Sequence, residues 1–255
     1  MMGATPAYLT AGFVLEEGLS MELLDRIVRT MAHAANVAGV PLITGDTKVV
    51  ERGKADGLYI NTTGFGLAEA SFQPGPTRAR PGDVILLSAP IGRHGMAIMA
   101  VREGLAFETT IKSDTANLAP LVAGLRDAAG ESVMVLRDPT RGGLASALNE
   151  IAQSSQVGMA LDETTLPVPN DVAAACEMLG LDPLYVANEG VLVVIVRPEG
   201  AESALAALRA HPLGADAVRI GEVVASHPGY VVLKTAMGGN RIVDLLPGDQ
   251  LPRIC

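Results

Sequence analysis

The sequence predicts an α/β or α+β fold in two domains, because apolar strand-like runs alternate with helical patterns along all 255 residues. Hydrophobic residues make up 49% of the chain and aromatic residues only 3%, so the core must be built from aliphatic side chains. Proline and glycine cluster between Ala68 and Gly82, and we expect this stretch to join the domains. The predicted parts are an N-terminal domain at 1–70, a linker at 71–82, a C-terminal domain at 83–244 and a mobile tail at 245–255.

The N-terminal domain is predicted to contain one long helix and about three strands. From Ser20 to Gly39, apolar residues recur at three- and four-residue steps, which indicates an amphipathic helix with a serine N-cap. The residues 45–48 predict a turn, because Gly and Asp favour turns. Strands are expected around this turn and before the helix, at 8–15, 40–44, 49–50 and 58–66.

The C-terminal domain is predicted to alternate strands with helices. The runs 84–88 and 191–196 are continuously apolar, which is typical of strands buried on both faces. Other strands are expected at 133–137, 158–161 and 219–224, before a final hairpin. Helices are expected from the segment 92–95 to about Glu103, and over 115–128, 144–154, 170–179 and 202–210.

Charge and hydropathy exclude several classes of protein. The net charge is −9, and no basic stripe exists to meet phosphates, so nucleic acid is not an expected partner. No apolar run approaches the roughly 18–20 uncharged residues of a membrane span. The N-terminus carries no basic region before an apolar block, so we expect a cytoplasmic protein without a membrane partner.

The last residue, Cys255, is one of only two cysteines, the other being Cys176. Pro247 and Gly248 break helix and strand, so the terminal thiol is expected on a short tether. Prenylation needs three residues after the cysteine and is excluded. An inert thiol, a disulfide to Cys176 and a reactive thiol stay open, although a reducing compartment argues against the disulfide. The α-carboxylate beside Cys255 disfavours the thiolate, so a reactive thiol requires an activating pocket.

Three polar segments with glycine lie where apolar strands meet loops, and each has a functional and a purely structural interpretation. Asp46, Thr47 and Lys48 offer a carboxylate, a hydroxyl and an ammonium, which together can hold a metal–phosphate group. The carboxylate suits Mg²⁺, and the lysine can meet phosphate oxygens. The alternative is a hairpin turn with a solvated lysine.

The second segment, 138–143, ends a strand in Asp138 and begins a helix with two glycines. Backbone N–H groups at that helix start can cradle an anion, and Arg141 can clamp it. The spacing differs from both the Walker P-loop and the Rossmann fingerprint. The alternative is a capped helix with a surface arginine.

The third segment places Asn188 and Glu189 at the mouth of a buried strand. Glu189 can act as a general base if desolvation raises its pKa, whereas a glutamate in a turn is more often solvated. The four histidines lack the spacing of a metal site, so zinc and iron are not expected. His94 is the only one of them in a plausible site.

Five segments together carry a resemblance to a known family: 45–50, 92–95, 138–143, 187–190 and 252–255. They resemble the HypE family, the carbamoyl dehydratases of nickel–iron hydrogenase maturation, and the terminal Pro-Arg-Ile-Cys is the most specific part. This family is related to aminoimidazole ribonucleotide (AIR) synthetase, selenophosphate synthetase and thiamine-phosphate kinase, which bind ATP without a P-loop. The resemblance implies a two-domain PurM-like (AIR synthetase-like) fold and a homodimer in which N-terminal strands pair.

The same resemblance implies an activity and partners. A carbamoyltransferase, HypF, would place a carbamoyl group on Cys255, and ATP-dependent dehydration would convert this thiocarboxamide to a thiocyanate. The cyano group would then pass to iron on a HypC–HypD complex. By similarity, Cys255, Lys48 and Glu189 are the predicted catalytic residues, with Glu189 taking a proton from the carboxamide nitrogen. The predicted ligands of ATP are Asp46, Thr47, Asp138, Arg141, Asn188 and His94, and those of Mg²⁺ are Asp46 and Asp138.

Two departures from the family are visible. The family has a further N-terminal segment with a glycine-rich entry, an aspartate-bearing strand and an Asn-Asp turn, so we expect an incomplete N-terminal domain with an exposed sheet edge. Arg93 stands where the family usually has Asp, which predicts a reversed charge near the phosphates. Two alternatives stay open: another ATP-dependent enzyme that forms amides or amidines from a small substrate, and a non-catalytic scaffold fragment.

Overall fold

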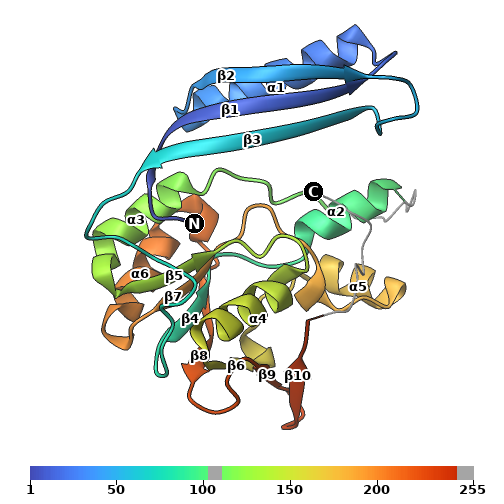
Figure 1. The fold of residues 1–255 in the computed structure, drawn as a ribbon. Coiled ribbons are helices and arrows are strands. Elements are labelled where there is room, and N and C mark those ends of the chain that lie inside the picture. The colour runs from blue at the N-terminus through green and yellow to red at the C-terminus, as the bar shows by residue number, and fades with distance from the viewer. Residues whose placement is uncertain (103–110, 246–255) are drawn as a thin grey trace. The chain divides into compact units, whose positions relative to one another are not determined.

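The computed structural model describes residues 1–102 and 111–245 and contains two compact units (Figure 1). The smaller unit is Ala4–Glu69, and the larger one contains Met1–Gly3 and the chain from Ala70 onward. Each unit has its own β-sheet with helices, so the predicted α/β class is confirmed. Cys255, on which the terminal-thiol prediction depends, lies outside the described residues.

The smaller unit is one helix and a three-stranded sheet in the order β2-β1-β3. The helix α1 connects the parallel strands β1 and β2, and β3 returns antiparallel to β1. As predicted, α1 begins after Ser20 and ends at Gly39, whose φ of 67° is left-handed. The bounds are β1 Thr5–Glu16, α1 Met21–Ala38, β2 Leu42–Val50 and β3 Leu58–Leu67.

The turn predicted at 45–48 is wrong, because these residues lie inside the continuous strand β2. Gly45 pairs with Ala11 of β1, and a Cβ at Gly45 would lie 2.2 Å from the Ala11 carbonyl oxygen. This glycine therefore permits a close approach of two strands. The sequence pattern suggested a turn because glycine is common both in tight turns and where two strands approach closely.

The larger unit contains a seven-stranded mixed sheet in the order β10-β9-β6-β8-β4-β7-β5. The interior strands β4 and β7 are buried at every residue, as their continuous apolar runs predicted. Neighbouring strands are antiparallel except for the parallel pair β6 and β9. The bounds are β4 Val84–Leu87, β5 Val133–Arg137, β6 Gly158–Asp162, β7 Val193–Val196, β8 Val218–Val224, β9 Val231–Lys234 and β10 Asn240–Val243.

Helices cover both faces of this sheet. The side chains of α3 and α6 pack with Leu86 and Val194 in one core cluster, whereas α4 packs with Ile85 and Ile195 in another. A third cluster joins α2 to α5. The bounds are α2 Arg93–Arg102, α3 Ala119–Ala129, α4 Gly143–Ser155, α5 Asn170–Leu179 and α6 Pro198–Ala210.

Two helices begin four residues away from their predicted starts, and proline explains both differences. The helix α3 starts at Ala119 rather than at 115, because Pro120 is tolerated only in the first turn. The helix α6 starts at Pro198 rather than at 202, with this proline at its first position. No helix among the described residues is long and apolar enough to cross a membrane.

Candidate active site

The smaller unit presents Asp46 and Lys48 on one face of its sheet. Side chains alternate along β2, so Asp46 and Lys48 share a face while Thr47 lies on the opposite one. All three residues are exposed, and the Asp46 carboxylate accepts a hydrogen bond from the Thr47 backbone N–H at 2.8 Å. The predicted turn would have allowed these three side chains to form one cluster. In the strand they do not form one, because Thr47 lies on the opposite face.

The carboxylate of Asp46 fits Mg²⁺ as a ligand. This ion favours carboxylate oxygens and usually completes its shell with water and substrate phosphates. The described residues contain no group of three or more His, Cys, Asp or Glu side chains that could hold a metal ion without such ligands. Asp46 belongs to the smaller unit and Asp138 to the larger one. Their joint coordination of Mg²⁺ stays a prediction.

In the larger unit, Asn188 joins three loops. Its side-chain oxygen accepts a hydrogen bond from the Gly92 backbone N–H at 2.7 Å, and its amide donates to the carbonyl oxygens of Pro139 and Val186 at 2.9 and 3.0 Å. Asn188 is 0% exposed. The residue thus holds the loop before α2 and the loop after β5 against the segment before β7.

The most unusual feature of the larger unit is a cluster of three titratable side chains, His94, Asp114 and Glu189. The Asp114 carboxylate accepts a hydrogen bond from the Glu189 backbone N–H at 2.8 Å. His94 is 8% exposed, and its Nδ1 lies 2.9 Å from the Ser113 hydroxyl. We call these three residues the His94 cluster.

Burial raises the pKa of both carboxyl groups of the His94 cluster. For Asp114, burial outweighs the hydrogen bond from Glu189 and the field of His94, which lower its pKa. For Glu189, burial is again the largest cause; His94 lowers the pKa, and the charges of Asp114 and Asp138 raise it. A raised pKa brings a carboxyl group closer to the pH range in which it can accept and return protons.

The loop after β5 places Asp138 and Arg141 at the surface of the same unit. The Asp138 carboxylate is 34% exposed and lies 3.6 Å from Arg137. Gly142 and Gly143 have φ values of 74° and 63°, and a Cβ at Gly143 would lie 2.4 Å from the Leu184 carbonyl oxygen. The two glycines are thus required by the backbone at the start of α4, and the predicted contact of this loop with a nucleotide stays a prediction.

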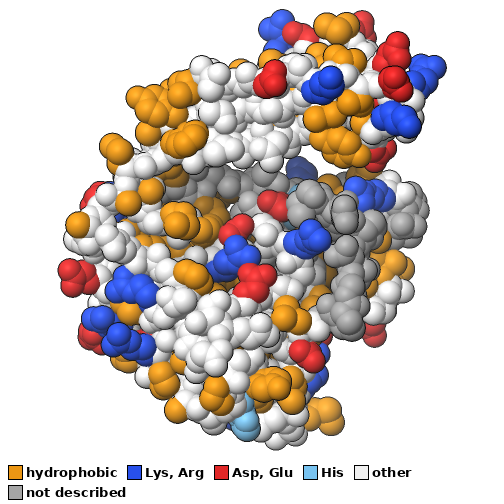
Figure 2. Space-filling model, viewed as in Figure 1, with side chains coloured by type: hydrophobic (Ala, Val, Ile, Leu, Met, Phe, Trp, Pro, Cys, Tyr) orange, Lys and Arg blue, Asp and Glu red, His pale blue; other side chains and the backbone are white. Residues whose placement is uncertain are grey.

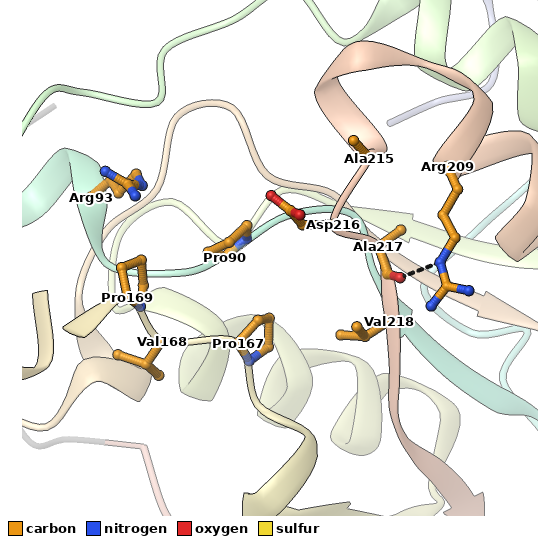
Figure 3. Close-up of a pocket in the computed structure, with 10 residues that line it drawn as sticks. All are labelled: Pro90, Arg93, Pro167, Val168, Pro169, Arg209, Ala215, Asp216, Ala217 and Val218. Carbon is orange, nitrogen blue, oxygen red and sulfur yellow. Dashed lines mark hydrogen bonds between the residues drawn. The ribbon is translucent and has the colours of Figure 1, made fainter.

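Arg93 does not join the His94 cluster. It lines a cavity of about 550 Å³ with Pro90, Pro167 and Pro169 (Figure 3). Its guanidinium lies 3.9 Å from the carboxylate of Asp171. The charged neighbours that act on Glu189 are His94, Asp114 and Asp138. The expected effect of Arg93 on the phosphates stays a prediction.

Cys176 is a core residue of α5 and not a reactive thiol. Its side chain is 1% exposed and packs with Met96 and Val172. Burial raises the pKa of this thiol to about 11, so the thiolate is scarce at neutral pH.

Sequence reasoning missed Asp114 and Ser113, because it placed a helix start at Thr115 and assigned no chemistry to the residues before it. The structure brings this segment against the mouth of β7, where Gly190 would place a Cβ 1.8 Å from the Asp114 carbonyl oxygen. The only local signal was an aspartate that precedes a proline-containing helix. Its partner, Glu189, lies 75 residues away.

Comparisons with known proteins agree over the whole chain. Residues 1–68 match the family model "AIR synthase related protein, N-terminal domain", and residues 80–234 match the C-terminal domain model of the same name. Carbamoyl dehydratase HypE of Rhizobium leguminosarum bv. viciae is 55% identical over 255 residues, which are 100% of this chain and 73% of the relative.

Solved structures give the same result. A crystal structure of the hydrogenase maturation protein HypE in complex with ATP has a TM-score of 0.95 and 50% identity, and the match covers 100% of this chain and 77% of that one. A HypE–HypF complex has a TM-score of 0.93 and 48% identity, covering 96% of this chain and 80% of the other. The chain belongs to the carbamoyl dehydratase HypE family of hydrogenase maturation proteins, within the AIR synthase related fold.

Proposed function

We propose that this chain uses ATP to dehydrate a carbamoyl group carried on its own Cys255, giving a thiocyanate that supplies the cyanide ligand of a hydrogenase iron. The observation that carries the proposal is Glu189, a half-buried carboxyl group with raised pKa in a chain of the HypE family. The reaction requires a base that removes protons from a carboxamide nitrogen. Since ATP is the second substrate, we place the reaction in the cytoplasm.

The reaction balances with ATP as the acceptor of the carboxamide oxygen. That oxygen attacks the γ-phosphorus, ADP leaves, and the nitrogen loses one proton. The C–O bond then breaks as phosphate departs with the electron pair, and the nitrogen loses its second proton as C≡N forms. Phosphorylation converts oxide, a very poor leaving group, into phosphate.

The roles of the side chains follow from their chemistry. Glu189 accepts a proton from nitrogen, and the Lys48 ammonium neutralises charge on the transferred phosphoryl group. Asp46 and Asp138 would hold Mg²⁺, which offsets phosphate charge when bound. Asn188 fixes the loops that carry His94 and Glu189, and we assign Asp138 and Arg141 to binding of the nucleotide.

The partners are proposed from the tail and from a relative. A related HypE has been solved in a complex with HypF. We infer that HypF binds this chain and places the carbamoyl group on Cys255. A HypC–HypD complex would receive the cyano group. In this proposal Cys255 meets one partner, then the active site and then the other partner.

A homodimer is proposed from the smaller unit. Its edge strands β2 and β3 have unpaired sides among the described residues, and its strands expose large apolar side chains (Figure 2). Exposed apolar surface next to an open sheet edge favours association with another chain. The exposed residues include Tyr8, Leu42, Ile43, Val49, Tyr59, Ile60, Phe65 and Leu67.

The test is intact-mass measurement of the carbamoylated chain after addition of Mg-ATP. The wild-type chain should lose the mass of one water, and Glu189→Gln should do so about a hundredfold more slowly or not at all. Glu177→Gln, an exposed glutamate of α5, is the matched control and should react at the wild-type rate. Hydrogenase maturation supported by Cys255→Ala in a complementation assay would contradict the proposal.

A further inference from the structure

Each residue of the His94 cluster has one buried polar atom that lacks a hydrogen-bond partner in the described structure. These atoms are His94 Nε2, Asp114 Oδ2 and Glu189 Oε1. Buried polar atoms are nearly always paired in folded proteins, since leaving one unpaired costs free energy. Three unpaired atoms in one cluster therefore indicate a group that binds there.

The chain holds these three residues together by contacts that do not involve the unpaired atoms. Asp114 Oδ1 accepts from the Glu189 N–H at 2.8 Å, which leaves Oδ2 for another donor. His94 Nδ1 is occupied by the Ser113 hydroxyl at 2.9 Å, which leaves Nε2. His94 acts electrostatically on both carboxyl groups, and Asp114 acts on Glu189. The unpaired atoms thus belong to one preorganised set.

The set has a definite hydrogen-bonding pattern. Two carboxylate oxygens are acceptors. In the tautomer in which His94 Nδ1 accepts from the Ser113 hydroxyl, the ring proton lies on Nε2, which is then a donor. A primary carboxamide has the complementary pattern, with two N–H donors on one nitrogen and one carbonyl acceptor.

We propose that Asp114 binds the substrate carboxamide directly, with its Oδ2 accepting the second N–H of the amide. Glu189 Oε1 accepts the first N–H, and His94 Nε2 donates to one lone pair of the carbonyl oxygen, leaving the other to attack phosphorus. This inference rests on the proposed function and adds Asp114 and His94 as substrate-binding residues. Because dehydration removes both protons from nitrogen, a site with two carboxylate acceptors matches the reaction.

Substitutions at Asp114 separate this role from a structural one. Asp114→Asn can keep Oδ1 as the acceptor of the Glu189 N–H and changes only the unpaired oxygen into an NH2 group. Asp114→Ala removes both interactions. Asp83→Asn is the matched control, because Asp83 is also a buried carboxylate that accepts a backbone N–H, from Arg80 at 2.8 Å, in a turn before β4.

Single-turnover dehydration of the carbamoylated chain is the first measurement. Asp114→Asn should be slower by about tenfold to a hundredfold, close to Asp114→Ala, with unchanged ATP binding by calorimetry and cooperative thermal unfolding. Asp83→Asn should react at the wild-type rate. If Asp114→Asn reacts like wild type and only Asp114→Ala is slow, Asp114 is structural and the inference is overturned.

A binding measurement tests the inference even if the wild-type chain shows no dehydration, an outcome that would count against the proposed function alone. Acetamide, added in the presence of Mg-ATP, should shift the His94 imidazole resonances in NMR spectra of the full chain. N,N-Dimethylacetamide has no N–H and should not shift them, and Asp114→Asn should weaken the acetamide effect. Equal responses to both amides would overturn the inference.

Discussion

Glu189, the base of the proposed reaction, is also a residue whose ionised form destabilises the fold. Its carboxyl group lies half-buried beside Asp114, and the charges of Asp114 and Asp138 further disfavour its ionised form. His94 offsets part of this effect. A glutamate whose folded-state pKa is raised stabilises the fold only while it is protonated, so its contribution is present at low pH and is lost as the pH rises through that pKa.

Glu189→Gln is therefore expected to raise the melting temperature at neutral pH relative to wild type, because it removes a poorly solvated charge. At about pH 4, near the ordinary pKa of glutamate, the difference should shrink because wild-type Glu189 is then largely protonated. Thermal unfolding of both proteins across this range measures the effect. The exposed Glu177→Gln should show no such trend, and a gap that is constant with pH would contradict the prediction.

At the scale of elements, β2 and the loop before α4 show why glycine-rich segments are hard to interpret locally. Gly45 lies in a strand, where it allows β1 to approach. Gly142 and Gly143 lie at the start of α4 with positive φ values. The residue type is the same in both places. Only the segment of this chain that packs against each glycine distinguishes a strand contact from a helix start.

Gly45→Ala is expected to destabilise the smaller unit by about 1–3 kcal/mol, because the new Cβ would meet the Ala11 carbonyl oxygen at 2.2 Å. Gly64→Ala on β3 is the matched control, since its Cβ would lie 3.6 Å from a Leu9 methyl group, an ordinary contact. Denaturant unfolding, followed by a spectroscopic signal of Tyr59 or Tyr8, reports on this unit. Equal losses of stability for the two variants would show that the close strand approach is not the cause.

At the scale of the whole molecule, the two units differ in how much core they contain. The larger unit buries two extended aliphatic clusters against its sheet. In the smaller unit, the buried hydrophobic residues are Ala11 and Val40 alone, and α1 has no buried residue. A unit with so little buried apolar surface gains much of its stability from whatever covers it.

Hydrogen exchange should reveal this difference. At low protein concentration, amides of β2 and β3 should exchange much faster than those of β5 and β7, and raising the concentration should slow β2 and β3 selectively as the proposed dimer forms. Mass spectrometry of peptides from each strand measures both rates. Protection of β2 and β3 that is already high and independent of concentration would contradict a dimer that covers these strands.

The sequence by itself determined the α/β class, the buried strands β4 and β7, the boundaries of α1 and the segments by which the HypE family is identified, because each depends on residues close together in the chain. The tertiary structure decided what depends on distant pairs. It placed 45–48 within a strand and Arg93 in the lining of a cavity. It also brought Asn188 into hydrogen bonds with the loop before α2 and the loop after β5. It also joined Asp114 to Glu189 across 75 residues, since only the folded chain brings a loop before α3 to the mouth of β7.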